Sequence, residues 1–167
     1  PYFLKTIVTT EMARKVAEAN GVTCCDTFTG FKFMAEKKNE LEGQGKGQII
    51  MSYEESYGYM LGDYVRDKDA VTASLILTEM AAWYAAQGMT LFDALNALYE
   101  KYGYYGEKTH NLVMPGLDGL EKMANLMKAL RQTPPTEISG VAVVRRKDYT
   151  DGSVVDCATG AVSGMEL

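Results

Sequence analysis

Three short segments rich in strand-forming residues most constrain how this chain can fold. They are FLKTIVTT (3–10), VTCCDTF (22–28) and GQIIMSY (47–53), and residues 11–20 and 31–41 between them have the features of helices. Strands joined by helical crossovers are expected to be parallel, and such crossovers are nearly always right-handed. The pattern therefore predicts an α/β fold with a mainly parallel sheet.

Polar turns lie at the ends of these three segments: Thr9-Thr10, residues 26–30 and residues 54–56. Right-handed parallel units place the loops that leave each strand at the same carboxyl edge of the sheet. In open α/β sheets that edge is where ligands bind. We therefore expect the three turns to converge on a ligand site.

The residues in and after the third turn suit a phosphosugar. A carboxylate and a hydroxyl, such as those of Glu54 and Ser56, can hydrogen-bond vicinal sugar hydroxyls. Lys68 supplies a point charge for a phosphate near the start of a predicted helix. Residue chemistry alone leaves open that these are solvated surface charges. Asp67 and Asp69 are a weaker candidate metal site, because two aspartates cannot fill an octahedral shell.

Two further helices are predicted downstream. Asp69 can cap a helix from about Ala70 to Gln87, whose apolar residues surround its axis and predict burial on more than one side. Thr90 begins a capping-box variant for a helix that ends near residues 102–105. A domain boundary is predicted here, so that residues 1–105 form a three-layer α/β/α domain.

Residues 106–167 have a different pattern. A strand is predicted at 109–114, followed by a helix that Asp118 caps together with Glu121. A further strand is predicted over 140–152, ending in an Asp-Gly hairpin signal. The residues from 153 to 167 contain no balancing helix and no further clear strand. This region is predicted to be an incomplete α+β module.

Composition narrows the function classes. A net charge of −5 and a pI near 5.0 predict no general attraction to nucleic acid or to anionic membranes. No leader or membrane-spanning stretch is recognisable, so a cytoplasmic protein is expected.

Cys24 and Cys25 are expected to be reduced residues in or near the core. The single histidine, His110, gives little support for a zinc site. Because Pro1 cannot be an initiator residue, we expect a piece of a longer polypeptide.

Four segments carry a family resemblance. TTEMARKVAEANGV, DTFTGFKFMAEK, SYEESYGYMLGDYVRDKDAV and LYEKYGYYGEK resemble the third domain of the α-D-phosphohexomutases, the phosphoglucomutases and phosphomannomutases. The resemblance runs over about residues 4–108. In that family a glycine followed by Glu-x-Ser forms the sugar-recognition loop. Residues 54–56 fit Glu-x-Ser, whereas Tyr53 stands where many members have the glycine.

Two other family positions have counterparts here. The Thr-Gly turn beside the bound sugar phosphate matches Thr29 and Gly30, with Phe31 where other members have Trp or His. The family's lysine before the long helix matches Lys68. The resemblance thus implies that Glu54, Ser56, Lys68, Thr29 and Gly30 bind substrate.

For the whole enzyme, the resemblance implies phosphoryl transfer between C6 and C1 of a hexose through a bisphosphorylated intermediate. Magnesium and a hexose 1,6-bisphosphate activator are implied as well. The family's phosphoserine loop, its Asp-x-Asp-x-Asp magnesium loop and its Arg-Pro-Ser-Gly-Thr clamp have no match in this sequence. The chain is therefore expected to contain no catalytic or metal-binding residue, to be inactive alone, and to depend on the other domains of a parent enzyme.

Alternatives to the enzyme interpretation stay open at this point. The chain could be a stand-alone phosphosugar-binding or regulatory module, and residues 106–167 could be a protein-interaction arm. The preference for glucose, mannose or a pentose also stays open, because Glu54 and Ser56 are expected to contact the C3 and C4 hydroxyls.

Overall fold

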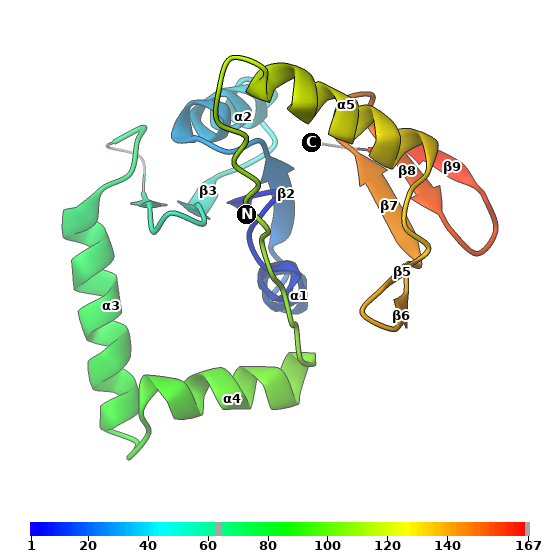
Figure 1. The fold of residues 1–167 in the computed structure, drawn as a ribbon. Coiled ribbons are helices and arrows are strands. Elements are labelled where there is room, and N and C mark those ends of the chain that lie inside the picture. The colour runs from blue at the N-terminus through cyan, green and yellow to red at the C-terminus, as the bar shows by residue number, and fades with distance from the viewer. Residues whose placement is uncertain (63–64, 166–167) are drawn as a thin grey trace. The chain divides into compact units, whose positions relative to one another are not determined.

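The computed structural model describes residues 1–62 and 65–165, which form two compact units divided between Thr109 and His110 (Figure 1). In the first unit the elements are β1 (Tyr2–Thr6), α1 (Glu11–Ala19), β2 (Thr23–Thr27), α2 (Phe31–Gly43), β3 (Ile49–Tyr53), β4 (Tyr59–Leu61), α3 (Ala70–Ala85) and α4 (Leu91–Tyr102). The predicted β-α-β-α-β order is confirmed.

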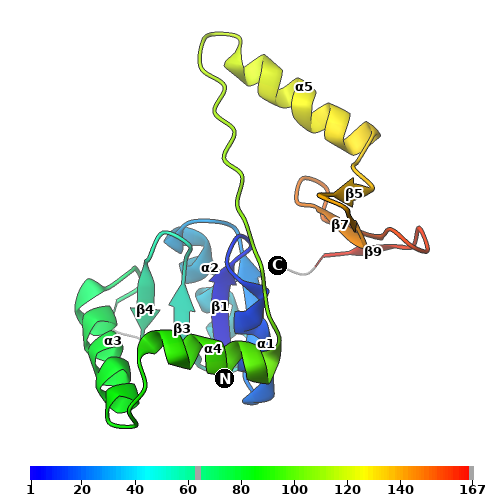
Figure 2. The same cartoon turned by 60° about the horizontal axis from the view of Figure 1, so that its bottom comes forward.

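The first unit has a four-stranded sheet in the order β2-β1-β3-β4. β1 pairs in parallel with both β2 and β3, whereas β4 runs antiparallel to β3. The predicted mainly parallel sheet is therefore confirmed, and the short β4 hairpin strand is an addition. The crossovers from β1 to β2 and from β2 to β3 run in opposite directions, so right-handed connections place α1 and α2 on opposite faces (Figure 2). The sheet and the two helices form three layers.

The first strand ends at Thr6, earlier than the strand-like segment 3–10 and its predicted turn at Thr9-Thr10 indicate. The reason is a tight turn, in which the amide and the hydroxyl of Thr9 both donate to the Thr6 carbonyl, at 3.1 and 2.6 Å. The Thr10 side chain then accepts a hydrogen bond from the Met12 amide and caps α1, as its residue type predicts.

The two faces of the sheet differ in polarity. Alternate residues of a strand point to opposite faces, and the apolar set faces α2. The core cluster on that face comprises Leu4, Phe31, Met34, Leu41, Ile49 and Met60. On the face covered by α1, Lys5 and Asp26 are buried polar residues. The sheet therefore has an apolar core on one side and a charged cluster on the other.

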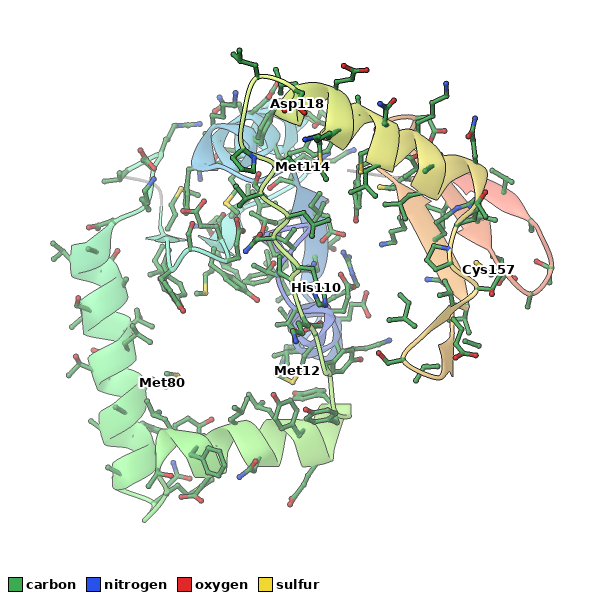
Figure 3. The ribbon with its side chains drawn as sticks, viewed as in Figure 1. Met12, Met80, His110, Met114, Asp118 and Cys157 are labelled. Carbon is green, nitrogen blue, oxygen red and sulfur yellow. The ribbon has the colours of Figure 1, made fainter. Side chains whose placement is uncertain are left out.

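The burial predicted for α3 is wrong. The helix begins where predicted, with the Asp69 carboxylate accepting from the Val71 amide at 2.9 Å. However, Val71 is 79% exposed, Trp83 is 61% exposed, and side chains stand out on several sides of the helix, including the labelled Met80 (Figure 3). The physical reason is that α3 follows the edge strand β4 and contacts that strand and α4 instead of covering a face of the sheet.

The second unit contains α5 (Gly119–Gln132), β5 (Glu137–Ile138), β6 (Val141–Ala142), β7 (Arg145–Asp148), β8 (Ser153–Asp156) and β9 (Val162–Gly164). The Asp-Gly hairpin is confirmed, because β7 and β8 pair antiparallel on either side of residues 149–152. β8 also pairs with β9, so the prediction of no further strand after residue 153 is wrong. The pairing partners, which a single segment cannot reveal, stabilise these short strands.

Three other predictions for the second unit are wrong. Residues 109–114, which include the labelled His110 and Met114, form no strand, and they pair with no strand among residues 1–62 and 65–165 (Figure 3). The single strand predicted over 140–152 is divided into β6 and β7. Asp118 precedes α5 without a side-chain cap and instead pairs with Lys122 at 2.6 Å.

The cysteines of the described residues are all free. Cys24 is buried, Cys25 is half-buried and Cys157 is exposed. Burial raises the pKa of the Cys24 thiol to about 11, so this thiol is protonated at neutral pH. No helix within residues 1–62 and 65–165 is both long and apolar enough to cross a membrane.

Candidate functional site

The parallel strands β1, β2 and β3 end at one edge of the sheet, at Thr6, Thr27 and Tyr53 (Figure 2). The Ile7 amide still donates to the Thr27 carbonyl at 3.0 Å, which keeps β1 and β2 together at their ends. The three predicted polar turns leave the sheet from this edge. The candidate site is built from these turns and from residues just beneath them.

A buried lysine lies beneath the turns. Lys5 is completely buried, and its Nζ lies 2.8 Å from Glu11 Oε1 and 3.0 Å from Asp26 Oδ1. The same ammonium donates to the Thr9 carbonyl at 3.3 Å. Burial lowers the Lys5 pKa, but the hydrogen bonds and charges of Glu11 and Asp26 outweigh that effect and hold the pKa above its usual value. Lys5 therefore fixes the β1–α1 turn as a charged group.

Arg14 completes this cluster of charges. Its guanidinium lies 3.0 Å from Glu11 Oε2 and 2.7 Å from Asp26 Oδ1, and it donates to the Cys24 carbonyl at 2.8 Å. Two cations and two carboxylates thus balance each other between α1, β1 and β2. The sequence patterns did not reveal this cluster, because a lysine within a strand ordinarily indicates a solvent-facing position.

The turn between β3 and β4 holds the two adjacent carboxylates in different environments. Glu54 is only 9% exposed, and its amide donates to the Gly58 carbonyl at 3.0 Å. Glu55 is exposed, and its Oε2 accepts a hydrogen bond from Thr6 Oγ1 at 2.6 Å. Among the described residues, none donates a hydrogen bond to the Glu54 carboxylate or forms an ion pair with it. Glu55 therefore anchors the turn to β1, and Glu54 keeps its acceptor oxygens available.

Position 58 requires a glycine because a larger residue would not fit there, and not because of its backbone dihedral angles. A Cβ atom at this position would lie 2.7 Å from Glu54 Oε1 and 2.7 Å from Phe31 Cε2. Both distances are far shorter than a van der Waals contact. The Glu54 carboxylate and the Phe31 ring therefore both lie close to the Gly58 backbone, a proximity that the sequence analysis did not predict.

Phe31 links the second turn to Lys68. It is the first residue of α2, and it is buried. Lys68 Nζ lies 5.3 Å from the centroid of its ring, and also 3.3 Å from Asp67 Oδ1. Gly30, which precedes Phe31, has φ of 110°, and it begins α2 without a side-chain cap. That φ is one that only glycine adopts without strain.

The structure thus brings three of the five predicted site residues near one ring. Gly30 precedes Phe31 in the chain, Glu54 approaches Gly58 on the same side as the ring, and Lys68 lies over the ring. Thr29 and Ser56 are exposed in the turns. Neither of their hydroxyls forms a hydrogen bond within residues 1–62 and 65–165. The arrangement offers a carboxylate, an ammonium, two hydroxyls and an uncapped helix N-terminus at one edge of the sheet.

We expect Gly58→Ala to destabilise the first unit by about 1–3 kcal/mol, because the added methyl must displace Glu54 and the Phe31 ring. The measurement is urea unfolding followed by circular dichroism. Gly43→Ala is the matched control, because a Cβ at Gly43 meets nothing within 4 Å and the residue lies in a helix. A Gly58→Ala variant as stable as the Gly43→Ala variant would contradict the close approach at Gly58.

Residues 2–102 match the protein family described as "Phosphoglucomutase/phosphomannomutase, alpha/beta/alpha domain III". The chain belongs to the phosphoglucomutase/phosphomannomutase family. The matched residues include β1 to α4, the whole of the sheet and the candidate site. The family resemblance drawn from the sequence is confirmed.

Individual relatives agree with membership of the phosphoglucomutase/phosphomannomutase family. A phosphoglucomutase of Staphylococcus saprophyticus is 30% identical over 166 residues, which are 99% of this chain and 30% of the relative. A phosphoglucomutase of Staphylococcus aureus (strain bovine RF122) is 33% identical over 151 residues, 90% of this chain and 27% of the relative. The chain therefore spans less than a third of the length of these two relatives.

A solved structure of the family also matches the fold. The open form of the Paramecium exocytosis-sensitive phosphoprotein pp63/parafusin, a phosphoglucomutase, has a TM-score of 0.58 and 19% identity. The match covers 97% of this chain and 27% of the Paramecium chain. At this level of identity the likeness concerns the fold alone.

Proposed function

We propose that this chain is the sugar-recognition part of a phosphohexomutase, an enzyme that interconverts hexose 1-phosphate and hexose 6-phosphate through a bisphosphate intermediate. The observation that carries the proposal is the grouping of Gly30, Glu54 and Lys68 around Phe31 at the carboxyl edge of the sheet. Membership of the phosphoglucomutase/phosphomannomutase family supports a phosphosugar as the ligand.

In this proposal Glu54 and Ser56 hold the sugar hydroxyls. The Glu54 carboxylate is held beside Phe31 and Gly58 with its acceptor oxygens available, and sugar hydroxyls are good donors to such a group. Each charge-assisted hydrogen bond of this kind contributes about 1.5–3 kcal/mol. We assign Glu55 to the turn rather than to the sugar, because its Oε2 accepts a hydrogen bond from Thr6 Oγ1.

The phosphate is proposed to lie near Lys68, Thr29 and Gly30. Lys68 supplies a positive charge, and the N-terminus of α2 offers backbone amides that no side chain caps. A hydroxyl from Thr29 adds a neutral donor. These groups bind and orient the phosphate, and they do not transfer it.

The remaining chemistry is assigned to other parts of the parent enzyme. Within the part of the chain that the structure describes, no group of three or more His, Cys, Asp or Glu residues is placed to hold a metal ion. The described residues therefore do not fit a magnesium site. We propose that residues 1–105 form the sugar-binding domain and that residues 106–167 begin the C-terminal domain, with the phosphate donor and its activator handled elsewhere.

The test of this function is an assay of hexose 6-phosphate formation from glucose 1-phosphate and from mannose 1-phosphate, with magnesium and a hexose 1,6-bisphosphate present. We expect turnover by the full-length protein that contains this chain and none by the 167-residue chain alone. Turnover by the chain alone would refute the proposal that phosphoryl transfer depends on other parts of the parent enzyme. A full-length protein inactive on both substrates would refute these two hexose phosphates as substrates.

A further inference from the structure

Two groups of opposite charge lie near the Phe31 ring. The Lys68 ammonium lies over the ring, 5.3 Å from its centroid. A Cβ atom at Gly58 would lie 2.7 Å from both Glu54 Oε1 and the Phe31 ring atom Cε2. A core phenylalanine ordinarily packs against apolar side chains, and neither the Lys68 ammonium nor the Glu54 carboxylate is apolar.

The charge distribution of a phenyl ring explains this arrangement. The face of the ring carries partial negative charge and the edge carries partial positive charge. A cation is therefore attracted to the face within about 6 Å of the centroid, and an anion is favoured at the edge. One buried ring can hold both groups of the proposed phosphosugar site in a fixed relation.

Lys68 needs such a restraint. Its side chain is 57% exposed, and a long, exposed lysine otherwise samples many rotamers. The neighbouring Asp67 carboxylate, at 3.3 Å, is itself exposed, so this ion pair restrains the ammonium only weakly. A ligand that finds its binding groups already ordered loses less free energy on binding.

We propose that Phe31 is a positioning residue that holds the Lys68 ammonium on its face and the Glu54 carboxylate at its edge. The proposal rests on the proposed function, because it assigns both held groups to one phosphosugar ligand. Phe31 acts through Lys68 and Glu54, and no contact between Phe31 and the sugar is required.

The test uses the 167-residue chain with its lysines dimethylated by ¹³C-formaldehyde, a change that keeps their positive charge. The Lys68 methyl signal is identified by its loss in Lys68→Arg. In the unsubstituted chain and in Phe31→Tyr we expect this signal to be shifted upfield by the ring current. In Phe31→Leu, which keeps an apolar side chain in the core, we expect it at the position of an ordinary exposed lysine.

A matched control exists on the same helix. Lys32 Nζ lies 4.7 Å from the centroid of the Phe33 ring. Phe33→Leu should move the Lys32 signal and leave the Lys68 signal in place. A Lys68 signal that is the same in the unsubstituted chain and in a folded Phe31→Leu variant would overturn the proposal.

Ligand titrations of the same samples separate the two held groups. For inorganic phosphate, we expect the Kd of Phe31→Leu to rise about 2- to 5-fold, as loss of an exposed cation–π contact implies. For glucose 1-phosphate the rise should be larger, because Glu54 is released as well. Equal rises would overturn the Glu54 half of the proposal. A ring-shifted Lys68 signal that neither ligand perturbs would instead refute the proposed function and leave the Phe31–Lys68 contact standing.

Discussion

Replacing Glu54 with glutamine is expected to lower kcat/KM of the full-length protein by about 10- to 150-fold. Glutamine keeps the size of the side chain beside Phe31 and Gly58 but removes its charge. The loss of one charge-assisted hydrogen bond in the transition state costs about 1.5–3 kcal/mol, which gives this range. The measurement is the rate of hexose 6-phosphate formation at substrate concentrations well below KM.

Glu55→Gln is the matched control for this substitution. Glu55 contacts Thr6 Oγ1 rather than Phe31, and a glutamine oxygen can still accept that hydrogen bond. We therefore expect Glu55→Gln to keep kcat/KM close to that of the unsubstituted enzyme. Equal losses in the two variants, or no loss in Glu54→Gln, would mean that Glu54 is not the carboxylate that binds the sugar.

Replacing Lys5 with methionine is expected to lower the free energy of unfolding of the first unit by about 3–5 kcal/mol. Methionine fits the space of the lysine stem, but it leaves the buried Asp26 with Arg14 as its only cation among the described residues. Removing one partner of a buried ion pair has a cost of this size, because the remaining charge stays out of water. Native-state hydrogen exchange of the β1 and β2 amides measures the loss in this unit.

Lys15→Met is the control for Lys5→Met. Lys15 and its partner Glu18 are both exposed and lie 4.0 Å apart, so we expect a change below about 0.5 kcal/mol. A loss from Lys5→Met no larger than that from Lys15→Met would show that the charged cluster contributes nothing to stability.

The pH dependence of the Lys5→Met effect follows from the two shifted groups. Because the Lys5 pKa is raised, its stabilisation is fully present below the usual pKa of 10.5 and is lost as pH rises through the folded-state pKa. Glu11 also experiences a desolvation effect that raises its pKa, but Lys5 and Arg14 outweigh it and hold the pKa low. The Glu11 contribution is therefore lost as pH falls through its own folded-state pKa. The stability difference between the unsubstituted chain and Lys5→Met should be greatest around neutral pH.

The order of the elements in the first unit was predictable from the sequence, because it depends on local patterns. Strand-forming segments alternate with segments of helical spacing, and the residues that begin α1, α3 and α4 are polar caps with recognisable chemistry. Strands joined by helical crossovers are parallel, and this places the three strand ends at one edge of the sheet. Local pattern and topology together were enough to locate the candidate site.

Contacts between residues distant in the sequence decided which side chains are buried and how the charged groups pair. Lys5 is buried only because Glu11 and Asp26 reach it from α1 and β2. Gly58 must be a glycine only because Glu54 and Phe31, which lies far away in the chain, both come close to its backbone. The exposure of α3 depends on β4 turning antiparallel at the sheet edge, where a helix covers no face. Local sequence does not encode which partner arrives from elsewhere, so burial, charge pairing and the fit of the site became known only from the tertiary structure.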